Sequence, residues 1–344
     1  MTSEGIRIAV TGAGAVTPAG WGMPLMLEGL RNGKPVEPSP LCAPGNDEGA
    51  VYLRRAVPKP CDEQFFLRQP RLRRASPAGR YLAAAAIEAL GDERQHTVAS
   101  GELRLGIVVS CYTGCINYSQ RFYREVLENP TTASPIIFPE TVFNAPASHL
   151  SALLGSSEVN YTVVGDESQF LAALEIGANW LVDGEVDAVL VAAAEESDWL
   201  SAEALSIFTN TPVLGEGAAA LLLERCESPD VEVELITDMF TFTRERPREK
   251  SLQAMREQLP CGNIAEILFE SGNEGPVWDD LQAERIRIRD IFGEGFGASV
   301  AWGCAAAAGF LELGLVNSAL VSGSGMNQAC AAVVLVGNGV GKTN

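Results

Sequence analysis

Residues 161–174 read YTVVGDESQFLAAL, and this stretch decides the fold. It opens with an apolar run that favours a strand. Gly165 then permits a sharp turn, and the alanine- and leucine-rich residues after the turn favour a helix. Glu167 lies inside the turn, between the strand and the helix. The sequence therefore predicts a strand, a tight turn and a helix of small residues, with a carboxylate in the turn.

Other apolar segments extend this pattern along the chain. They are continuous rather than alternating, as in strands buried on both faces, and alanine-rich stretches such as 82–90 and 170–181 separate them. We therefore expect an α/β protein with covered sheets. The expected strands are residues 6–10, 105–109, 188–193, 218–223, 264–269 and 331–336.

Composition excludes several classes of protein. The chain has 344 residues, 47% of them hydrophobic, so it can bury a large core. A net charge of -19 without a long basic segment argues against nucleic acid or an anionic membrane as partner. No apolar run is long enough to span a bilayer, and residues 1–7 lack the pattern of a signal peptide. Eight irregularly spaced cysteines suggest reduced core residues in a cytoplasmic protein.

Two short patterns suggest ligand sites on weak grounds. Cys111 and Cys115 have no second pair or nearby histidine to complete a zinc site, so no metal is expected. Gly12 and Gly14 after a strand could form a dinucleotide loop. However, a third glycine and a following acidic residue are missing, and Pro18 would break the helix that such a loop needs. No cofactor is therefore expected.

Further segments occur in an order that is informative as a set. They are residues 8–20 (IAVTGAGAVTPAG), 138–155, 215–224 (GEGAAALLLE), 293–298 (GEGFGA) and 322–327 (SGSGMN). Together with residues 161–174 they resemble the β-ketoacyl synthases over nearly the whole chain. The resemblance implies a thiolase-like, duplicated five-layer αβαβα fold, with halves at residues 1–225 and 226–344.

The resemblance also implies where catalytic groups would lie. Glu167 falls at the nucleophilic cysteine, Gly272 at the first histidine and Glu294 at the second. Arg289 falls at the family lysine and keeps its positive charge. No catalytic residue is therefore expected, because a carboxylate attacks a thioester poorly and would give a labile anhydride. The glycine-rich gating loop falls on Gly323, Ser324 and Gly325.

Alternatives to the loss of catalysis remain. Glu167 and Glu294 could act as a general acid and base, since paired buried carboxylates raise one another's pKa. They could instead be held in salt bridges, with Arg289 as the partner. Cys111 or Cys115 could replace the nucleophile, although neither has a histidine close in sequence. His149, the second of two histidines, is expected to be packed or partly exposed on a helix.

The chain looks like a chain-length factor, the non-catalytic subunit of a type II polyketide synthase. This implies a heterodimer with a catalytic ketosynthase and contact with an acyl carrier protein. An enzyme that decarboxylates or hydrolyses acyl thioesters, and a homodimeric acyl-binding regulatory protein, are the alternatives. Residues 159–163 are expected to form an unpaired edge strand that a partner covers. The acyl tunnel is expected at Ile116, Tyr118, Ser119, Phe122 and Tyr123, whose aromatic residues could equally be interface core.

Two charged segments complete the expectations. A basic cluster in this acidic chain indicates a solvated helix start or a docking site for an acidic partner. Residues 244–250 carry mixed charges and are predicted to be a solvated loop. The basic cluster consists of Arg68, Arg71, Arg73, Arg74 and Arg80.

Overall fold

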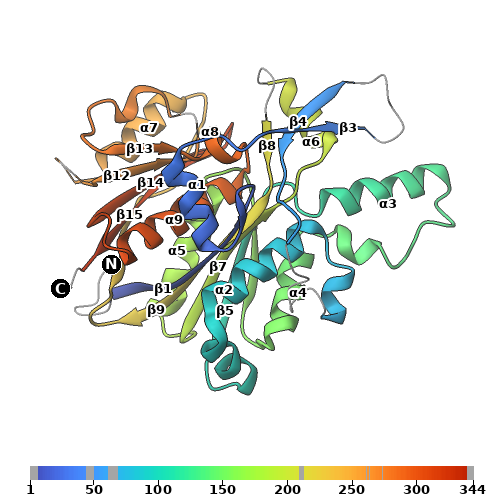
Figure 1. The fold of residues 1–344 in the computed structure, drawn as a ribbon, viewed down its shortest axis with the longest axis horizontal. Coiled ribbons are helices and arrows are strands. Elements are labelled where there is room, and N and C mark those ends of the chain that lie inside the picture. Colours follow the sequence, from blue (N-terminus) through green and yellow to red (C-terminus); the bar gives the residue numbers. More distant parts are fainter. Residues whose placement is uncertain are drawn as a thin grey trace.

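The structure is a computed structural model that describes residues 7–43, 50–60, 69–208, 213–260, 262, 264–272 and 274–338. A 12-stranded mixed sheet runs through these residues, with helices on its faces (Figure 1). Its strands are β1 (Arg7–Thr17), β2 (Gly20–Trp21), β5 (Leu105–Cys111), β6 (Asn160–Val164), β7 (Ala188–Glu195), β9 (Gly217–Cys226), β10 (Val231–Ile236), β11 (Phe240–Thr241), β12 (Ile267–Glu270), β13 (Glu284–Arg287), β14 (Ser318–Ser324) and β15 (Ala329–Gly337). A 3-stranded sheet contains β3 (Ser39–Cys42), β4 (Val51–Arg55) and β8 (Val213–Gly215).

The main sheet repeats one pairing pattern on each side of the antiparallel contact between β1 and β10. Outward from β1, the β1–β9 and β9–β7 pairs are antiparallel, and the β7–β5 and β5–β6 pairs are parallel. Outward from β10, the β10–β15 and β15–β14 pairs are antiparallel, and the β14–β12 and β12–β13 pairs are parallel. This repetition confirms the duplicated α/β architecture.

The helices divide the sheet into layers. One core lies between α2 and α4 and the first half of the sheet, and another lies between α7 and the second half. The largest core surrounds α5 and α9, which lie between the two halves of the sheet. Five layers follow. The helices are α1 (Met23–Asn32), α2 (Pro77–Ser100), α3 (Ile116–Glu128), α4 (Ala145–Leu154), α5 (Gln169–Val182), α6 (Trp199–Ser206), α7 (Arg248–Glu257), α8 (Ile288–Phe292) and α9 (Gly297–Glu312), with single 3-10 turns at Pro70–Arg73, Phe138–Thr141 and Gly275–Trp278.

Helix α9, in the layer between the two halves of the sheet, is apolar on all sides rather than amphipathic. Almost every residue of α9 is buried, and most are alanine or other small residues. Small side chains let sheets approach a helix from both sides, and a helix that is apolar all round is typical of such a buried position. No helix in the described ranges is long and apolar enough to cross a membrane.

The glycines of β1 pack against a helix rather than forming a ligand loop. β1 continues without a turn to Thr17, past Gly12 and Gly14. A Cβ atom on Gly12 would lie 2.0 Å from the carbonyl oxygen of Ala89, and one on Gly14 would lie 2.1 Å from that of Ala85. The dinucleotide alternative is therefore wrong: these glycines allow α2 to approach the strand.

Most expected strands match the observed ones, with shifted ends. Residues 264–269 were expected to form a strand, whereas β12 begins only at Ile267 and ends at Glu270. The expected edge strand is confirmed, because β6 is the last strand on its side of the sheet.

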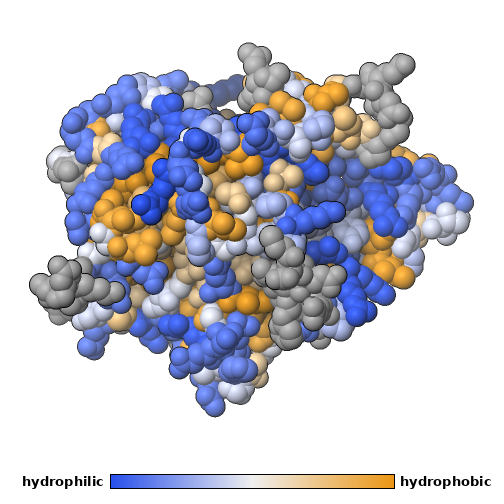
Figure 2. Space-filling view, in the orientation of Figure 1, coloured by the Kyte–Doolittle hydropathy of each residue, from blue (hydrophilic) through white to orange (hydrophobic). Residues whose placement is uncertain are grey.

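One helix stands away from the layers. Figure 1 shows α3 extending outward from the sheets, and none of its side chains is buried. Hydrophobic residues gather above it, over β4 and α6 (Figure 2). Val51 of β4 and Leu200 of α6 have exposed side chains. We call α3 and the following residues 129–143 the arm.

Candidate functional site

Glu167 lies in a tight turn between β6 and α5, as the sequence predicts. Its side chain is fully buried. Oε1 accepts a hydrogen bond from Arg289 Nη2 at 2.9 Å, and Oε2 accepts one from the backbone N–H of Met326 at 3.1 Å. Both carboxylate oxygens are therefore engaged by groups of the chain.

Arg289 joins the two glutamates that stand at family catalytic positions. Its Nη2 also forms an ion pair with Glu294 Oε2. The other oxygen of Glu294 accepts a hydrogen bond from the backbone N–H of Phe296 at 2.8 Å. The arrangement expected from the salt-bridge alternative is thus what the structure contains. We call Glu167, Arg289 and Glu294 the charged triad.

The charged triad has one cation for two carboxylates. Burial raises the pKa of Glu167, and the nearby Glu294 raises it further, while Arg289 opposes both effects. Burial lowers the pKa of Arg289, but Glu294 and Glu167 more than offset this, so its pKa lies above the ordinary value. Arg289 therefore stays positive, and the triad favours a proton on Glu167 as the pH falls toward neutrality.

Position 272 has no room for an imidazole. A Cβ atom on Gly272 would lie 2.2 Å from the backbone oxygen of Ser324. The preceding Ser271 is buried and donates its hydroxyl to the carbonyl oxygen of Ser299 at 3.1 Å. Of the described residues that directly follow β12, Ser271 is already hydrogen-bonded and Gly272 has no side chain, so neither offers a side-chain donor to a thioester carbonyl.

The glycine-rich loop is packed onto the turn that holds Glu167. A Cβ atom on Gly325 would lie 1.8 Å from Asp166 Oδ2. Asp166 also accepts a hydrogen bond from the backbone N–H of Gln328 at 2.8 Å, and the side chain of Gln328 accepts one from the Asp166 N–H at 3.0 Å. Gly323 and Ser324 form the end of β14, so residues 323–328 are continuous with the sheet.

Arg248 fixes this loop from the other side, which the sequence analysis did not anticipate. It donates to Ser324 Oγ and to the carbonyl oxygen of Gly325, each at 2.6 Å, and also to that of Met326. Its guanidinium lies over the ring of Phe242, 4.5 Å from the centroid. The prediction that residues 244–250 form a solvated loop is wrong here, because Arg248 begins α7 and is tied to the site.

Phe296, whose backbone N–H donates to Glu294, has an unusual backbone conformation. Its φ is 47° and its ψ is -125°, a backbone conformation that residues other than glycine rarely adopt. The ring stacks on Tyr112 with centroids 4.8 Å apart. Burial and the charges of Glu167 and Asp166 raise the pKa of Tyr112, so this tyrosine faces the buried acids and stays neutral. A stacked aromatic pair thus lies near the buried acids of the turn.

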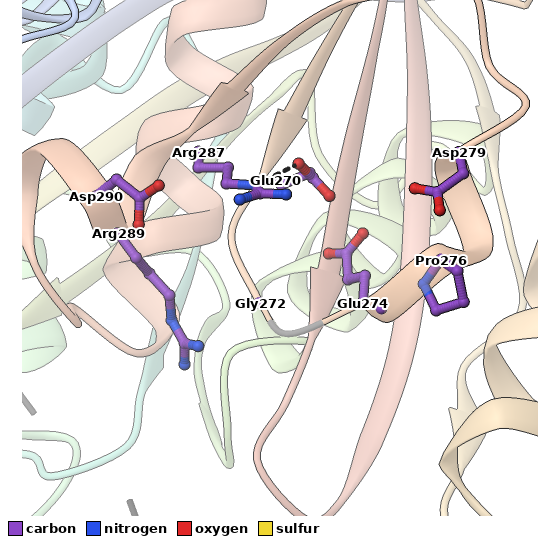
Figure 3. Close-up of a pocket in the computed structure, with 9 residues that line it drawn as sticks. Glu270, Gly272, Glu274, Pro276, Asp279, Arg287, Arg289 and Asp290 are labelled. Atoms are coloured by element: carbon purple, nitrogen blue, oxygen red, sulfur yellow. Dashed lines mark hydrogen bonds and ion pairs between the residues drawn. The ribbon is translucent and has the colours of Figure 1, made fainter. Parts of the chain in front are cut away.

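A polar pocket of about 510 Å³ lies beside the triad (Figure 3). Figure 3 shows Glu270 and Arg287 facing each other, with Glu274 below them. Glu274 is buried, and burial raises its pKa to about 7 against the hydrogen bonds from Ser322 and Trp278. Arg289 lines the same pocket, so the pocket reaches the triad without exposing Glu167.

Cys111 and Cys115 offer no replacement nucleophile. Cys111 and Cys115 are both buried. Burial raises the pKa of the Cys115 thiol to about 12 and raises that of Cys111 further. Both are thiols rather than thiolates near neutral pH, so the cysteine alternative is not supported. His149 is partly exposed, as expected, and its Nε2 lies 2.8 Å from Glu140 Oε2.

The residues expected to line an acyl tunnel all lie on the arm and are not brought near Glu167 by any contact. Ile116, Ser119 and Tyr123 share one side of α3 and line a groove against α6. Phe122 packs on Phe138 with ring centroids 5.4 Å apart. Tyr118 is partly exposed. Within the basic cluster, Arg73 and Arg74 are exposed, while Arg68 and the side chain of Arg71 lie outside the described residues.

Comparison with protein families assigns residues 6–228 to the β-ketoacyl synthase N-terminal domain. A curated relative from Schizosaccharomyces pombe, named as a mitochondrial 3-oxoacyl-[acyl-carrier-protein] synthase, is 24% identical over 251 residues. The matched region covers 64% of this chain and 59% of that protein, so the chain spans about three fifths of the relative's length.

Solved structures support the same fold. The ishigamide ketosynthase/chain length factor superposes with a TM-score of 0.79 at 20% identity, covering 97% of this chain and 100% of that one. A type II polyketide synthase acyl-carrier protein in complex with its ketosynthase gives 0.77 at 18% identity, covering 96% and 99%. A β-ketoacyl synthase from Burkholderia phymatum gives 0.77 at 14% identity, covering 96% and 99%. These matches establish the thiolase-like ketosynthase fold.

Proposed function

This chain belongs to the β-ketoacyl synthase family, and within it we propose that the chain is a non-catalytic, chain-length-factor-like subunit. It would pair with a catalytic ketosynthase in type II polyketide or fatty-acid-like biosynthesis and shape the acyl tunnel of the complex. An acyl carrier protein would deliver the chain to that complex. The division into halves at residues 1–225 and 226–344 is part of the same proposal.

The observation that carries the proposal is the chemistry at position 167. A condensing enzyme needs a nucleophile that holds the acyl chain and donors that stabilise the enolate. Here the nucleophile position holds a buried carboxylate that is bonded to Arg289 and to the Met326 N–H. Its neighbours in the triad are ionic rather than imidazole groups. Such a turn is suited to stabilising the fold and not to transferring an acyl group.

Intact-mass measurement tests the loss of chemistry. The purified chain is incubated with an acyl-loaded carrier protein, and a catalytic ketosynthase serves as the positive control. We expect no stable acyl adduct on this chain and no condensation. A stable adduct that disappears in Glu167→Ala would contradict the proposal.

Assembly and product length test the partner role. The chain is co-expressed with a cysteine-bearing type II ketosynthase, and the complex is isolated. We expect co-purification. Truncating Tyr118, Phe122 or Tyr123 should lengthen the product by one or more extender units, and enlarging Ser119 should shorten it. An unchanged product distribution in complexes that still assemble would argue against a tunnel role for α3. If the chain forms only homodimers, the regulatory alternative is favoured instead.

One observation favours a second function, the decarboxylation or hydrolysis of acyl thioesters. The raised pKa of Glu167 places a readily protonated carboxyl group beside the side chain of Glu294. Turnover of malonyl and acyl thioesters by the purified chain alone, lost in both Glu167→Gln and Glu294→Gln, would support it. Absence of turnover favours the non-catalytic role.

A further inference from the structure

Two consecutive carboxylates hold residues 112–117, which join β5 to the first turn of α3 and which we call the root of the arm. Glu195 ends β7 and Glu196 follows it, and both side chains are buried. Side chains of consecutive residues in an extended chain point to opposite sides, so the two carboxylates reach different parts of the root. Their oxygens accept hydrogen bonds from backbone N–H groups. We call Glu195 and Glu196 the acidic pair.

Glu195 holds the segment that follows β5. Its Oε1 accepts the N–H of Tyr112 at 2.5 Å, and its Oε2 accepts the N–H and the hydroxyl of Thr113 at 3.1 and 2.7 Å. Burial raises the pKa of Glu195 to about 7, and these hydrogen bonds oppose the rise because they favour the ionised form. Tyr112 also stacks on Phe296, whose N–H donates to Glu294. The same carboxylate therefore links the arm to the charged triad.

Glu196 joins the arm to a helix of the layered core. Its Oε1 accepts the N–H of Asn117, in the first turn of α3, at 2.8 Å. Its Oε2 accepts the N–H of Ala78, in the first turn of α2, at 3.1 Å. Because helix N-termini carry a positive partial charge, one carboxylate stabilises both helix starts. Since α2 packs on β1 and β9, Glu196 fixes the start of α3 to a helix that the sheet holds in place.

Contacts within the arm give it its shape but do not set its direction. The hydroxyl of Ser119, for example, donates to the carbonyl oxygen of Thr141 at 3.3 Å, and both residues belong to the arm. No side chain of α3 is buried, so core packing does not orient this helix (Figure 1). The arm is also tied at Glu140, whose Oε2 lies 2.8 Å from His149 Nε2. The direction of α3 therefore depends on its attachments, and the acidic pair is the attachment at its first turn.

We propose that Glu195 and Glu196 are positioning residues, which fix the direction of the arm through its backbone N–H groups and thereby set the product length of the complex. Neither residue needs to touch the growing chain. The inference rests on the proposed function, since it takes the arm to shape the acyl tunnel. It adds a determinant of product length that lies outside the residues expected to line the tunnel.

Amide hydrogen exchange of the purified chain at pH 8, above the pKa of Glu195, tests the attachment. Glu195→Gln and Glu196→Gln keep the size of each side chain but replace one acceptor oxygen by an amide donor, so a backbone N–H loses its acceptor. In Glu195→Gln we expect amides 112–113 to exchange roughly tenfold faster or more, because hydrogen bonds to charged acceptors are strong. In Glu196→Gln we expect the same of Asn117 and Ala78. If one variant does not fold, the other remains the test.

The matched control is Glu88→Gln on α2. Glu88 also accepts backbone N–H groups, those of Ala15 and Met23, at 2.9 and 2.8 Å. The control should accelerate exchange at those two residues and leave the root of the arm unchanged. In the complex with a type II ketosynthase, Glu196→Gln should broaden the range of products by one or more extender units, whereas Glu88→Gln should leave the range as it is in the unmodified chain.

Two results would overturn the inference alone. One is exchange at the root that stays as slow in both acidic-pair variants as in Glu88→Gln. The other is a product distribution that changes with Tyr123→Ala but with neither acidic-pair variant, a result that leaves the proposed function standing. If Tyr123→Ala and both acidic-pair variants leave the products unchanged in complexes that assemble, the tunnel role of the arm is wrong and the inference fails with it.

Discussion

The charged triad and the arm differ in how far their side chains are buried and paired within the chain. In the triad, the oxygens of Glu167 have a cation and a backbone donor, and the side chain is fully buried. On the arm, no α3 side chain is buried, and Tyr123 and Leu127 are largely exposed. The first region is satisfied by groups of the same chain, whereas the second presents apolar side chains to solvent. Both features are consistent with the proposed non-catalytic subunit.

Removing the cation of the triad should have the largest effect. Arg289→Ala leaves Glu167 and Glu294 buried without a positive partner, and breaking a buried pair in this way costs about 3–5 kcal/mol. Urea unfolding measures the change. The control is Arg287→Ala, which removes an exposed arginine from Glu270, a residue that Arg285 still pairs. It should cost less than about 1 kcal/mol. Equal losses in the two variants would mean that the triad is not what holds the turn.

Releasing the glycine-rich loop should have the next largest effect. Arg248→Ala removes charge-assisted hydrogen bonds to Ser324, Gly325 and Met326, with an expected loss of about 1.5–3 kcal/mol. Hydrogen exchange should accelerate at residues 324–328. Arg246→Ala serves as the control, since Arg246 is exposed and lies over Phe240 with 5.6 Å to the centroid. If the loop exchanges at the same rate in both variants, its order comes from the contacts with Asp166 alone.

Buried acids predict a pH dependence with a definite sign. Burial raises the pKa of Glu274 to about 7, so the folded chain keeps a proton that the unfolded chain loses above about 4.5. This contribution to stability is complete below about pH 4.5, is lost as the pH rises toward 7, and is absent above 7. Glu274→Gln should therefore make the decrease of the unfolding free energy with rising pH less steep, by up to about 1.4 kcal/mol per pH unit. Unfolding curves at pH 5, 6, 7 and 8 test this. Glu203→Gln, at an exposed position, should leave the slope unchanged.

Substitutions on the arm should have the smallest effect on the isolated chain. Tyr123→Ala and Leu127→Ala remove exposed side chains, so each should change the free energy of unfolding by less than about 0.5 kcal/mol. Leu150→Ala on α4, a buried position, should cost about 2–5 kcal/mol. Thermal unfolding compares the three. A large loss in the arm variants would show that α3 packs more tightly within the chain than its exposure indicates.

The parts of this comparison that the sequence predicts are those with a local signal. Glu167 stands in a strand–turn–helix pattern, and Arg289 and Glu294 are five residues apart in one motif, so their meeting could be anticipated. The edge position of β6 also follows from ordered motifs. Arg248 carried no such signal, because its acceptors lie more than 70 residues away and nothing in a mixed charge run marks a long-range contact.

Packing constraints were also invisible in the sequence. The glycines at 12 and 14 resemble a loop fingerprint, yet they are set by the approach of Ala85 and Ala89 in a helix far along the chain. Likewise, nothing near Gly272 indicates that the backbone of Ser324 fills the space where a side chain would be. A one-dimensional pattern shows which residue is small but not what lies against it.

The position of α9 bears on how this chain reaches its native state during synthesis. Residues of α9 pack on β1, β7 and β9 of the first half as well as on β14 of the second. The first half therefore leaves the ribosome with the part of its sheet that α9 covers still exposed, although α5 of the same half already packs on β5 and β7. That part stays uncovered until residues 297–312 follow. Vectorial folding of the N-terminal part as a finished unit is thus disfavoured, and the nascent chain should need chaperone protection until late in translation.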